Sequence, residues 1–185
     1  MSKKGLIVVD LDKTLLDFDS FRYLTLQNIW NYKILYYTFL RKLRFLSAYD
    51  FKEKVMSFIL KNKGEKYFEG FVDNLVNSID KKVYNHVLNY QSEGDEILLL
   101  SASPKYYVDK IARNIKWASY GSTFKEIDKN MENLHLYGDE KVNYLTKNYL
   151  SETYQYKYAI SDSLSDMKLL TLFEKYTLLN NGNFI

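Results

Sequence analysis

Cysteine is absent from this 185-residue sequence, and histidine occurs only twice, as His86 and His135. The lack of cysteine excludes a disulfide framework, a thiolate nucleophile and a cysteine-ligated zinc site. With two histidines, a histidine-rich metal site or a serine–histidine triad is a poor first hypothesis. Any metal must therefore be held by carboxylates, which favours Mg²⁺ or another hard cation.

Proline and glycine are also scarce, with one Pro and seven Gly, and no low-complexity linker or internal repeat is present. The sequence is 46% hydrophobic and contains 18 Tyr and 11 Phe, which excludes a disordered chain and predicts a sizeable core. The first apolar run, residues 5–9, is too short for a secretory signal or a bilayer span. These features predict a cytoplasmic protein with one compact domain and a small insertion.

Short apolar runs predict strands that are covered on both faces, as in a parallel sheet. They lie at residues 5–9, 96–100, 156–160 and 176–179. Sequence of helical periodicity separates them, which is the β–α–β pattern of an α/β fold. The expected fold class is therefore α/β, with a Rossmann-like parallel sheet.

More than eighty residues separate the first two runs, far more than one crossover helix requires. Apolar residues recur at helical spacing through residues 18–80, which predicts a small inserted helical cap. Residues 1–17 and 81–185 are then expected to form the core domain, with residues 81–90 as the helix that returns to the sheet.

Polar side chains follow three of the predicted strands. Asp10 and Asp12 follow the first strand, Ser101 follows the second, and Asp162 and Asp166 follow the third. Each residue alone is an ordinary turn or cap residue. Because ligands of open α/β sheets bind beyond the carboxyl ends of the strands, we expect the five side chains to share one edge. Four carboxylates there would repel one another, so a bound cation is expected.

The same positions resemble the four motifs of the haloacid dehalogenase superfamily of aspartate-nucleophile phosphohydrolases. Residues 10–14, Asp-Leu-Asp-Lys-Thr, are similar to its first motif, DxDxT. Ser101 matches the Ser or Thr of the second motif, and Lys141 matches the lysine of the third. Residues 162–166 resemble the fourth motif, DxxxD. The motifs occur in order and span nearly the whole chain.

The resemblance implies a mechanism that uses an aspartate pair. Asp10 would be the nucleophile that forms an aspartyl-phosphate, and Asp12 would be the general acid and base. Mg²⁺ would be held by Asp10, by the main-chain carbonyl of Asp12 and by Asp162, while Asp166 would orient a metal-bound water or Lys141. These four aspartates are the expected metal-site residues.

The resemblance also implies contacts with a small phosphorylated substrate. Ser101 would donate to a phosphate oxygen, and Lys141 would balance the charge of the nucleophile and the phosphoryl group. Thr14 and Ala102 are further expected substrate-binding residues.

The helical insertion resembles that of the phosphoserine-phosphatase-like branch. There, Asp19 has the spacing of an acidic residue that binds the substrate ammonium, although it could equally cap a helix that begins at Ser20. Residues 101–104, Ser-Ala-Ser-Pro, stand where phosphoserine phosphatase has Ser-Gly-Gly, so the resemblance does not assign the substrate. Ser103 as N-cap and Pro104 at the first helical position would begin a helix whose N–H groups favour an anion.

Residues 22–66 are strongly basic, with ten Lys or Arg against three Asp or Glu, a net charge of +7. The favoured interpretation is a cap that buries its aromatic side chains while the basic side chains reach water. Contact with a membrane surface is the less favoured alternative, and no nucleic-acid partner or oligomeric state is predicted.

We therefore expect a Mg²⁺-dependent phosphohydrolase that cleaves a phosphate monoester through an aspartyl-phosphate. A phosphomutase of the same superfamily and a non-catalytic module that binds a phosphate ligand or a partner remain the alternatives. Neither His86 nor His135 is given a catalytic role; His135 is expected in a short hairpin over residues 124–136.

Overall fold

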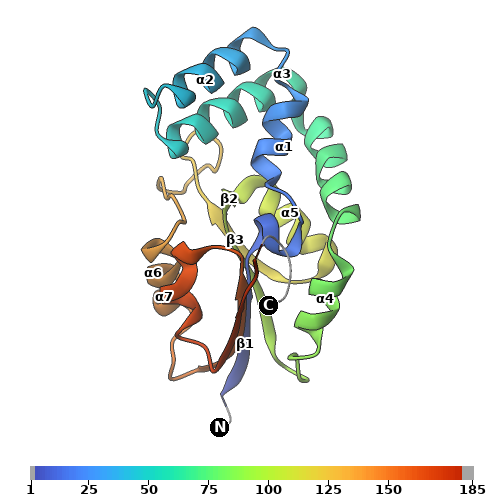
Figure 1. Ribbon diagram of the computed structural model, residues 1–185, viewed down its shortest axis with the longest axis vertical. Helices are drawn as coiled ribbons and strands as arrows, with labels where there is room; N and C mark the ends of the chain where they lie inside the picture. Colours follow the sequence, from blue (N-terminus) through green and yellow to red (C-terminus); the bar gives the residue numbers. More distant parts are fainter. Residues whose placement is uncertain (1–2, 181–185) are drawn as a thin grey trace.

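All five strands run parallel in a single sheet with the order β3-β2-β1-β4-β5. The computed structural model describes residues 3–180 (Figure 1). Its strands are β1 (Lys4–Val9), β2 (Glu96–Pro104), β3 (Ala118–Ser122), β4 (Tyr154–Ser161) and β5 (Lys175–Leu178). The helices are α1 (Ser20–Gln27), α2 (Tyr32–Lys42), α3 (Ala48–Asn77), α4 (Lys81–Leu88), α5 (Lys105–Ile115), α6 (Asp139–Asn148) and α7 (Met167–Leu170), with short helical turns η1 (Leu11–Leu15) and η2 (Leu164–Asp166). The expected α/β class and Rossmann-like sheet are confirmed.

Helices cover both faces of the sheet because each central strand is apolar on both sides. In β1, Ile7 and Val9 join the core on the side of α3, α4 and α5, whereas Leu6 and Val8 join the core on the side of α6 and α7. This alternation follows from the two-residue repeat of a strand. Continuous apolar runs therefore identified the buried strands correctly.

The chain runs outward from β1 through β2 to β3 and then returns to the other side of β1 to form β4 and β5. In open α/β sheets, the point at which the strand order reverses leaves a crevice at the carboxyl ends of the strands. Here that point lies at the ends of β1 and β4, where the polar residues follow each strand.

Three local predictions are wrong. The strand β3 was missed because its sequence, Ala-Ser-Tyr-Gly-Ser, is polar and forms the edge of the sheet. Residues 124–136 do not form a hairpin: a single antiparallel bridge joins Thr123 to Leu134 and closes a loop. Helix α5 begins at Lys105 with Pro104 as its N-cap, so Ser103 still belongs to β2 and does not cap the helix.

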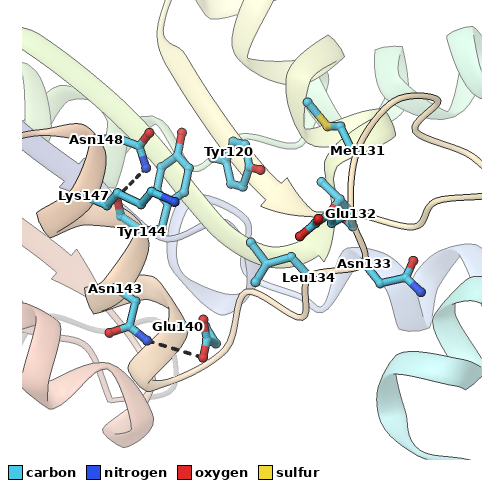
Figure 2. A pocket seen from close by; sticks show the side chains of 11 residues that line it. Tyr120, Met131, Glu132, Asn133, Leu134, Glu140, Asn143, Tyr144, Lys147 and Asn148 are labelled. Carbon is cyan, nitrogen blue, oxygen red and sulfur yellow. Dashed lines mark hydrogen bonds between the residues drawn. The ribbon is translucent and has the colours of Figure 1, made fainter.

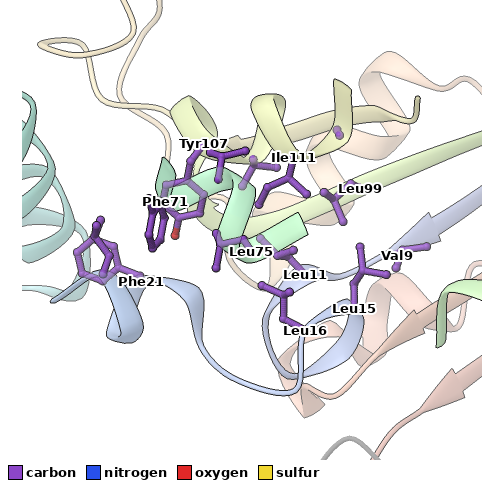
Figure 3. Close-up of a cluster of buried hydrophobic side chains, with 14 of the residues drawn as sticks. Val9, Leu11, Leu15, Leu16, Phe21, Phe71, Leu75, Leu99, Tyr107 and Ile111 are labelled. Atoms are coloured by element: carbon purple, nitrogen blue, oxygen red, sulfur yellow. The ribbon is translucent and has the colours of Figure 1, made fainter. Parts of the chain in front are cut away.

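The insertion between β1 and β2 is helical, as predicted, and helix α4 returns to the sheet at residues 81–88. Gly64 interrupts α3 with φ 72° and ψ −173°, a conformation that is essentially restricted to glycine. Beyond this break, Phe71 and Leu75 pack with Tyr107 and Ile111 of α5 in the main hydrophobic cluster (Figure 3). One core thus runs from the sheet into the insertion, and the limits 18–80 of a separate cap stay a prediction.

Within residues 3–180, no helix combines the length and the apolar character needed to cross a membrane.

Candidate active site

A tight turn after β1 places the first two aspartates at the edge of the sheet. Asp10 still pairs with β4 through a hydrogen bond from its N–H to the carbonyl of Ile160, at 3.0 Å. The chain then turns through η1, in which Lys13 has φ 56°, while Leu11 and Leu15 are buried beneath it. The buried leucines anchor the turn, so Asp10 and Asp12 are both held at the carboxyl end of β1.

Lys141 lies almost completely buried between two of the predicted carboxylates. Its Nζ donates to Oδ1 of Asp10 and to Oδ2 of Asp166, each at 2.7 Å. Ser161, at the end of β4, also donates to Oδ2 of Asp166 at 2.7 Å. The lysine of the first turn of α6 therefore joins Asp10, at the end of β1, to Asp166, in the turn η2 that follows β4, although the sequence places them far apart.

Burial is the largest single influence on the pKa values of Asp10 and Lys141. It raises the pKa of Asp10 to about 7, although the adjacent Lys141 opposes the shift. Burial alone would lower the pKa of Lys141, but the carboxylates of Asp10 and Asp166 outweigh it and raise that pKa. One ammonium faces two buried carboxyl groups, so a further positive charge beside Asp10 would stabilise its ionised form.

Asp12 is held by a different set of donors. Its Oδ1 accepts a hydrogen bond from the N–H of Ser20 at 2.6 Å, and its Oδ2 accepts one from the hydroxyl of Ser103 at 2.5 Å. Tyr107 lies within hydrogen-bond distance of the Ser20 hydroxyl, at 3.0 Å. Burial raises the pKa of Asp12, with these donors opposing it. The structure thus fixes the Asp12 carboxyl and favours its protonated form more than water would.

The residues expected to bind substrate divide into two groups. Ser101 and Ala102 line the cavity described below. Thr14 does not, because its hydroxyl accepts a hydrogen bond from the N–H of Asp162 at 2.9 Å and is buried there. Thr14 therefore supports the position of Asp162, which corrects its expected role. Asp19 lines the cavity and also caps α1 by accepting from the N–H of Arg22 at 2.7 Å.

A cavity of about 560 Å³ opens where the insertion meets the strand ends. Its lining includes the predicted residues Asp10, Asp12, Asp19, Ser101, Ala102, Lys141, Asp162 and Asp166. Sequence reasoning missed Lys13, Arg41, Ala48, Lys52, His135, Tyr137, Ser163 and Ser165, which also line it. The cavity brings together all the predicted catalytic side chains.

Lys52 is the most informative of the missed residues. It projects from α3 into the cavity, and its Nζ donates to the carbonyl oxygen of Ala102 at 2.8 Å. Burial lowers its pKa, while Asp12 and Asp19 act in the opposite direction. The only sequence signal for the position of Lys52 was its spacing of four residues from Ala48, which places both residues on the same face of the helix. The neighbouring Lys and Glu residues made this spacing hard to recognise in the sequence.

A second hollow of about 550 Å³ lies between α6 and the loop that follows β3 (Figure 2). It is lined by the stacked rings of Tyr120 and Tyr144, by Glu140 and Asn143, and by loop residues such as Glu132. None of the predicted catalytic residues lines it. The first cavity is therefore the candidate active site.

The oxygen donors around Asp10 can be compared with those expected to hold a hard cation. Among residues 3–180, no three carboxylate or imidazole side chains are grouped to hold a metal ion. Asp12 is engaged by serine donors and Asp166 by Lys141, so their carboxyl groups are not placed as direct ligands. The carboxylates of Asp10 and Asp162 and the main-chain carbonyl of Asp12 remain as oxygen donors. Oxygen donors with excess negative charge suit Mg²⁺.

A sequence model of one protein family matches residues 7–171, which is most of the chain. The family is described as haloacid dehalogenase-like hydrolase. This chain belongs to it. Among curated proteins, no sequence matches this haloacid dehalogenase-like hydrolase significantly.

Solved structures share the fold of this haloacid dehalogenase-like hydrolase at low sequence identity. A protein of unknown function from Bordetella pertussis Tohama I has a TM-score of 0.73 and 18% identity, covering 96% of this chain and 90% of its own. A phospho-aspartyl intermediate analogue of phosphoserine phosphatase has a TM-score of 0.58 and 16% identity, with coverages of 96% and 87%. The HAD-hydrolase YfnB from Bacillus subtilis, bound to magnesium, has a TM-score of 0.52 and 15% identity, with coverages of 97% and 90%.

Proposed function

We propose that this haloacid dehalogenase-like hydrolase is a phosphatase that cleaves phosphate monoesters through an aspartyl-phosphate on Asp10. The observation that carries the proposal is that two neighbouring carboxyl groups have different hydrogen-bond partners. Asp10 pairs with Lys141 at the cavity, whereas Asp12 is fixed by Ser20 and Ser103 and stays free of that ion pair. One group is thus suited to attack and the other to proton transfer.

In the first step, a carboxylate oxygen of Asp10 attacks phosphorus and the ester oxygen leaves. Asp12, whose pKa is raised by burial, gives its proton to that leaving oxygen. In the second step, ionised Asp12 takes a proton from water, which attacks the aspartyl-phosphate and releases phosphate. Asp12 regains its proton, so the cycle leaves both side chains unchanged.

The other buried groups around Asp10 balance the negative charge of the nucleophile and of the phosphate. A phosphate monoester repels an anionic nucleophile, so positive charge must lie beside both. Lys141 supplies one such charge at 2.7 Å from Asp10, and Asp166 fixes the lysine from its other side. Ser101 lies in the cavity wall, where its hydroxyl can donate to a phosphate oxygen. Mg²⁺ bound by Asp10, Asp162 and the Asp12 carbonyl would neutralise further phosphate charge.

We also infer that the inserted helices serve as a cap over the reaction. Hydrogen bonds join them to the core: Lys52 donates to the carbonyl of Ala102 within the cavity, and outside it the Tyr49 hydroxyl donates to the carbonyl of Thr123 at 2.6 Å. These contacts cover the strand ends and would keep bulk water from an acyl-phosphate while it is bound.

The direct test is hydrolysis of a generic aryl phosphate by the purified chain, with Mg²⁺ or with EDTA. We expect release of inorganic phosphate that requires Mg²⁺. The relatives described as a phosphoserine phosphatase intermediate analogue and as magnesium-bound support this expectation. Failure to hydrolyse any member of a panel of phosphorylated metabolites, or equal rates in EDTA, would contradict it. Transfer of the phosphoryl group to a sugar phosphate instead of water would indicate the mutase alternative.

Mg²⁺ should raise the melting temperature of the protein by about 5–10 °C at a hundredfold excess over its dissociation constant. The reason is that the pooled carboxylates bind the ion in the folded state only. Asp162→Asn should remove most of this shift, measured by scanning calorimetry. Asp139→Asn, an exposed residue paired with Lys168, is the matched control and should retain it. A full shift in Asp162→Asn would show that the ion binds elsewhere.

Lys52→Met should raise KM for small anionic substrates by about tenfold or more while changing kcat less. Its ammonium group lies within the cavity, where hydrogen bonds to charged groups are stronger than in water. Steady-state kinetics of the variant would measure the effect. Lys54→Met, an exposed lysine on the same helix, provides the control. Equal KM values for both variants and the wild type would remove Lys52 from the substrate site.

A further inference from the structure

The outward face of α2 is aromatic and apolar instead of polar. Helix positions on this face carry Tyr32, Leu35, Tyr36, Phe39 and Leu43, all exposed, and Ile34 is the only fully buried residue of α2. Trp30, 97% exposed, precedes the helix, and Phe45, 75% exposed, follows it. We call these seven residues the outer face of α2. Its exposure overturns our expectation that the cap buries its aromatic side chains.

This concentration of apolar surface is local. Of the fourteen large hydrophobic side chains that are exposed within residues 3–180, nine lie between Tyr23 and Phe45. Scattered exposed hydrophobic residues are normal, but a contiguous patch marks a contact surface. The helix lies at the end of the molecule opposite the start of β1, so the core does not obstruct an approach to it (Figure 1).

Positive charge accompanies the aromatic residues, and the segment that carries both contains no acidic residue. Residues 20–49 contain five Lys or Arg and no Asp or Glu. Of these, Lys33, Lys42 and Arg44 are exposed beside the outer face of α2, whereas Arg41 is partly buried and lines the active-site cavity. The outer face of α2 and the active-site cavity therefore have different basic residues of the same segment beside them.

We propose that the outer face of α2 docks on the surface of an anionic lipid bilayer. Trp, Tyr and Phe side chains settle at the headgroup level, and neighbouring Lys and Arg residues are attracted to anionic lipids. A flat, negatively charged surface complements an acid-free stretch of charge +5. A second copy of the chain would instead bring like charges together across a two-fold interface. The proposal does not depend on the reaction that the cavity performs.

Binding to vesicles tests the proposal with the full chain. We expect the protein to co-sediment with vesicles of equal parts phosphatidylcholine and phosphatidylglycerol, and to remain in solution with phosphatidylcholine alone. Trp30→Ser/Phe45→Ser and Lys42→Gln/Arg44→Gln should each weaken partitioning by about tenfold or more. The fluorescence of Trp30 should also shift to shorter wavelength on binding, whereas Trp117, stacked on Tyr84, should not respond.

Matched variants on other faces separate docking from general charge or hydrophobicity. Lys81→Gln/Lys82→Gln, at the start of α4 and far from α2 in Figure 1, removes the same charge, and Leu150→Ser/Leu172→Ser removes exposed apolar groups. Both controls should bind vesicles like the wild type, and unchanged melting temperatures would show that every variant folds. The proposal would be overturned if the wild-type protein did not bind anionic vesicles, or if the control variants lost binding as much as the variants of the outer face of α2. Self-association that Trp30→Ser/Phe45→Ser abolishes would assign the face to a second copy instead.

Discussion

Asp10→Asn is expected to reduce phosphate-ester hydrolysis to the background rate while leaving the protein folded. The neutral amide cannot form an acyl-phosphate, so the first covalent step is lost. Folding should tolerate the change because burial already disfavours the ionised form of Asp10, and Lys141 keeps its second partner, Asp166. Removing one of two carboxylates around a single ammonium does not leave that ammonium unpaired.

The measurement compares initial rates of freshly purified wild type and variant, with mass spectrometry to verify that the asparagine has not deamidated. The melting temperature without Mg²⁺ should be no lower than that of the wild type. Asp17→Asn, an exposed change seven residues further along the chain, is the matched control and should keep full activity. Substantial hydrolysis by verified Asp10→Asn would eliminate Asp10 as the nucleophile.

Asp12→Asn is expected to slow turnover by about 10²- to 10⁴-fold, the scale of lost general acid–base catalysis. The loss should depend on the substrate. An aryl phosphate has a leaving group that departs without a proton, so its first step should be nearly preserved while hydrolysis of the aspartyl-phosphate becomes slow. Rapid mixing should therefore reveal a burst of phenol release followed by a slow steady state.

An alkyl phosphate should show no burst with the same variant, because its leaving oxygen requires the proton. Ser103→Ala, which removes the donor to Oδ2 of Asp12, should give a smaller loss of the same kind. If Asp12→Asn slowed aryl and alkyl phosphates equally and without a burst, proton transfer would have to be assigned to another group.

The apolar runs predicted the central strands β1, β2 and β4, because a strand that is covered on both faces must be apolar throughout, and they also predicted the short edge strand β5. The edge strand β3 escaped this argument, since its residues, from Ala118 to Ser122, are partly polar and only Gly121 and Ser122 are fully buried. The positions of Asp10, Asp12, Asp162 and Asp166 after the ends of β1 and β4 also followed from the sequence, whereas Ser101 lies within β2, which extends to Pro104. Parallel strands that end in polar residues place them at one edge, whatever the lengths of the connections.

The tertiary structure alone decided which side chains complete the site. Lys141 was identified by its motif, but its double contact with Asp10 and Asp166 arises because the first turn of α6 lies beside the end of β1 and beside η2, the turn that follows β4. Lys52 had no motif at all, and it enters the cavity because the first turns of α3 place its Nζ beside the carbonyl of Ala102 in β2. Thr14, expected at the substrate, instead holds the N–H of Asp162.

The inserted helices show most clearly which features the sequence determines and which depend on packing. Helical periodicity and a charge of +7 over residues 22–66 could be read directly, because both depend only on the order of residues. Which face of α2 is covered depends on where α3 lies, because α2 packs against α3, and aromatic residues occur on both sides of the helix. The sequence thus determined that an α/β hydrolase carries a basic helical insertion after its first strand. Packing decided that this insertion turns Lys52 and Arg41 toward the cavity and leaves Tyr32, Tyr36 and Phe39 facing outward, because side-chain burial is fixed by neighbours distant in the chain.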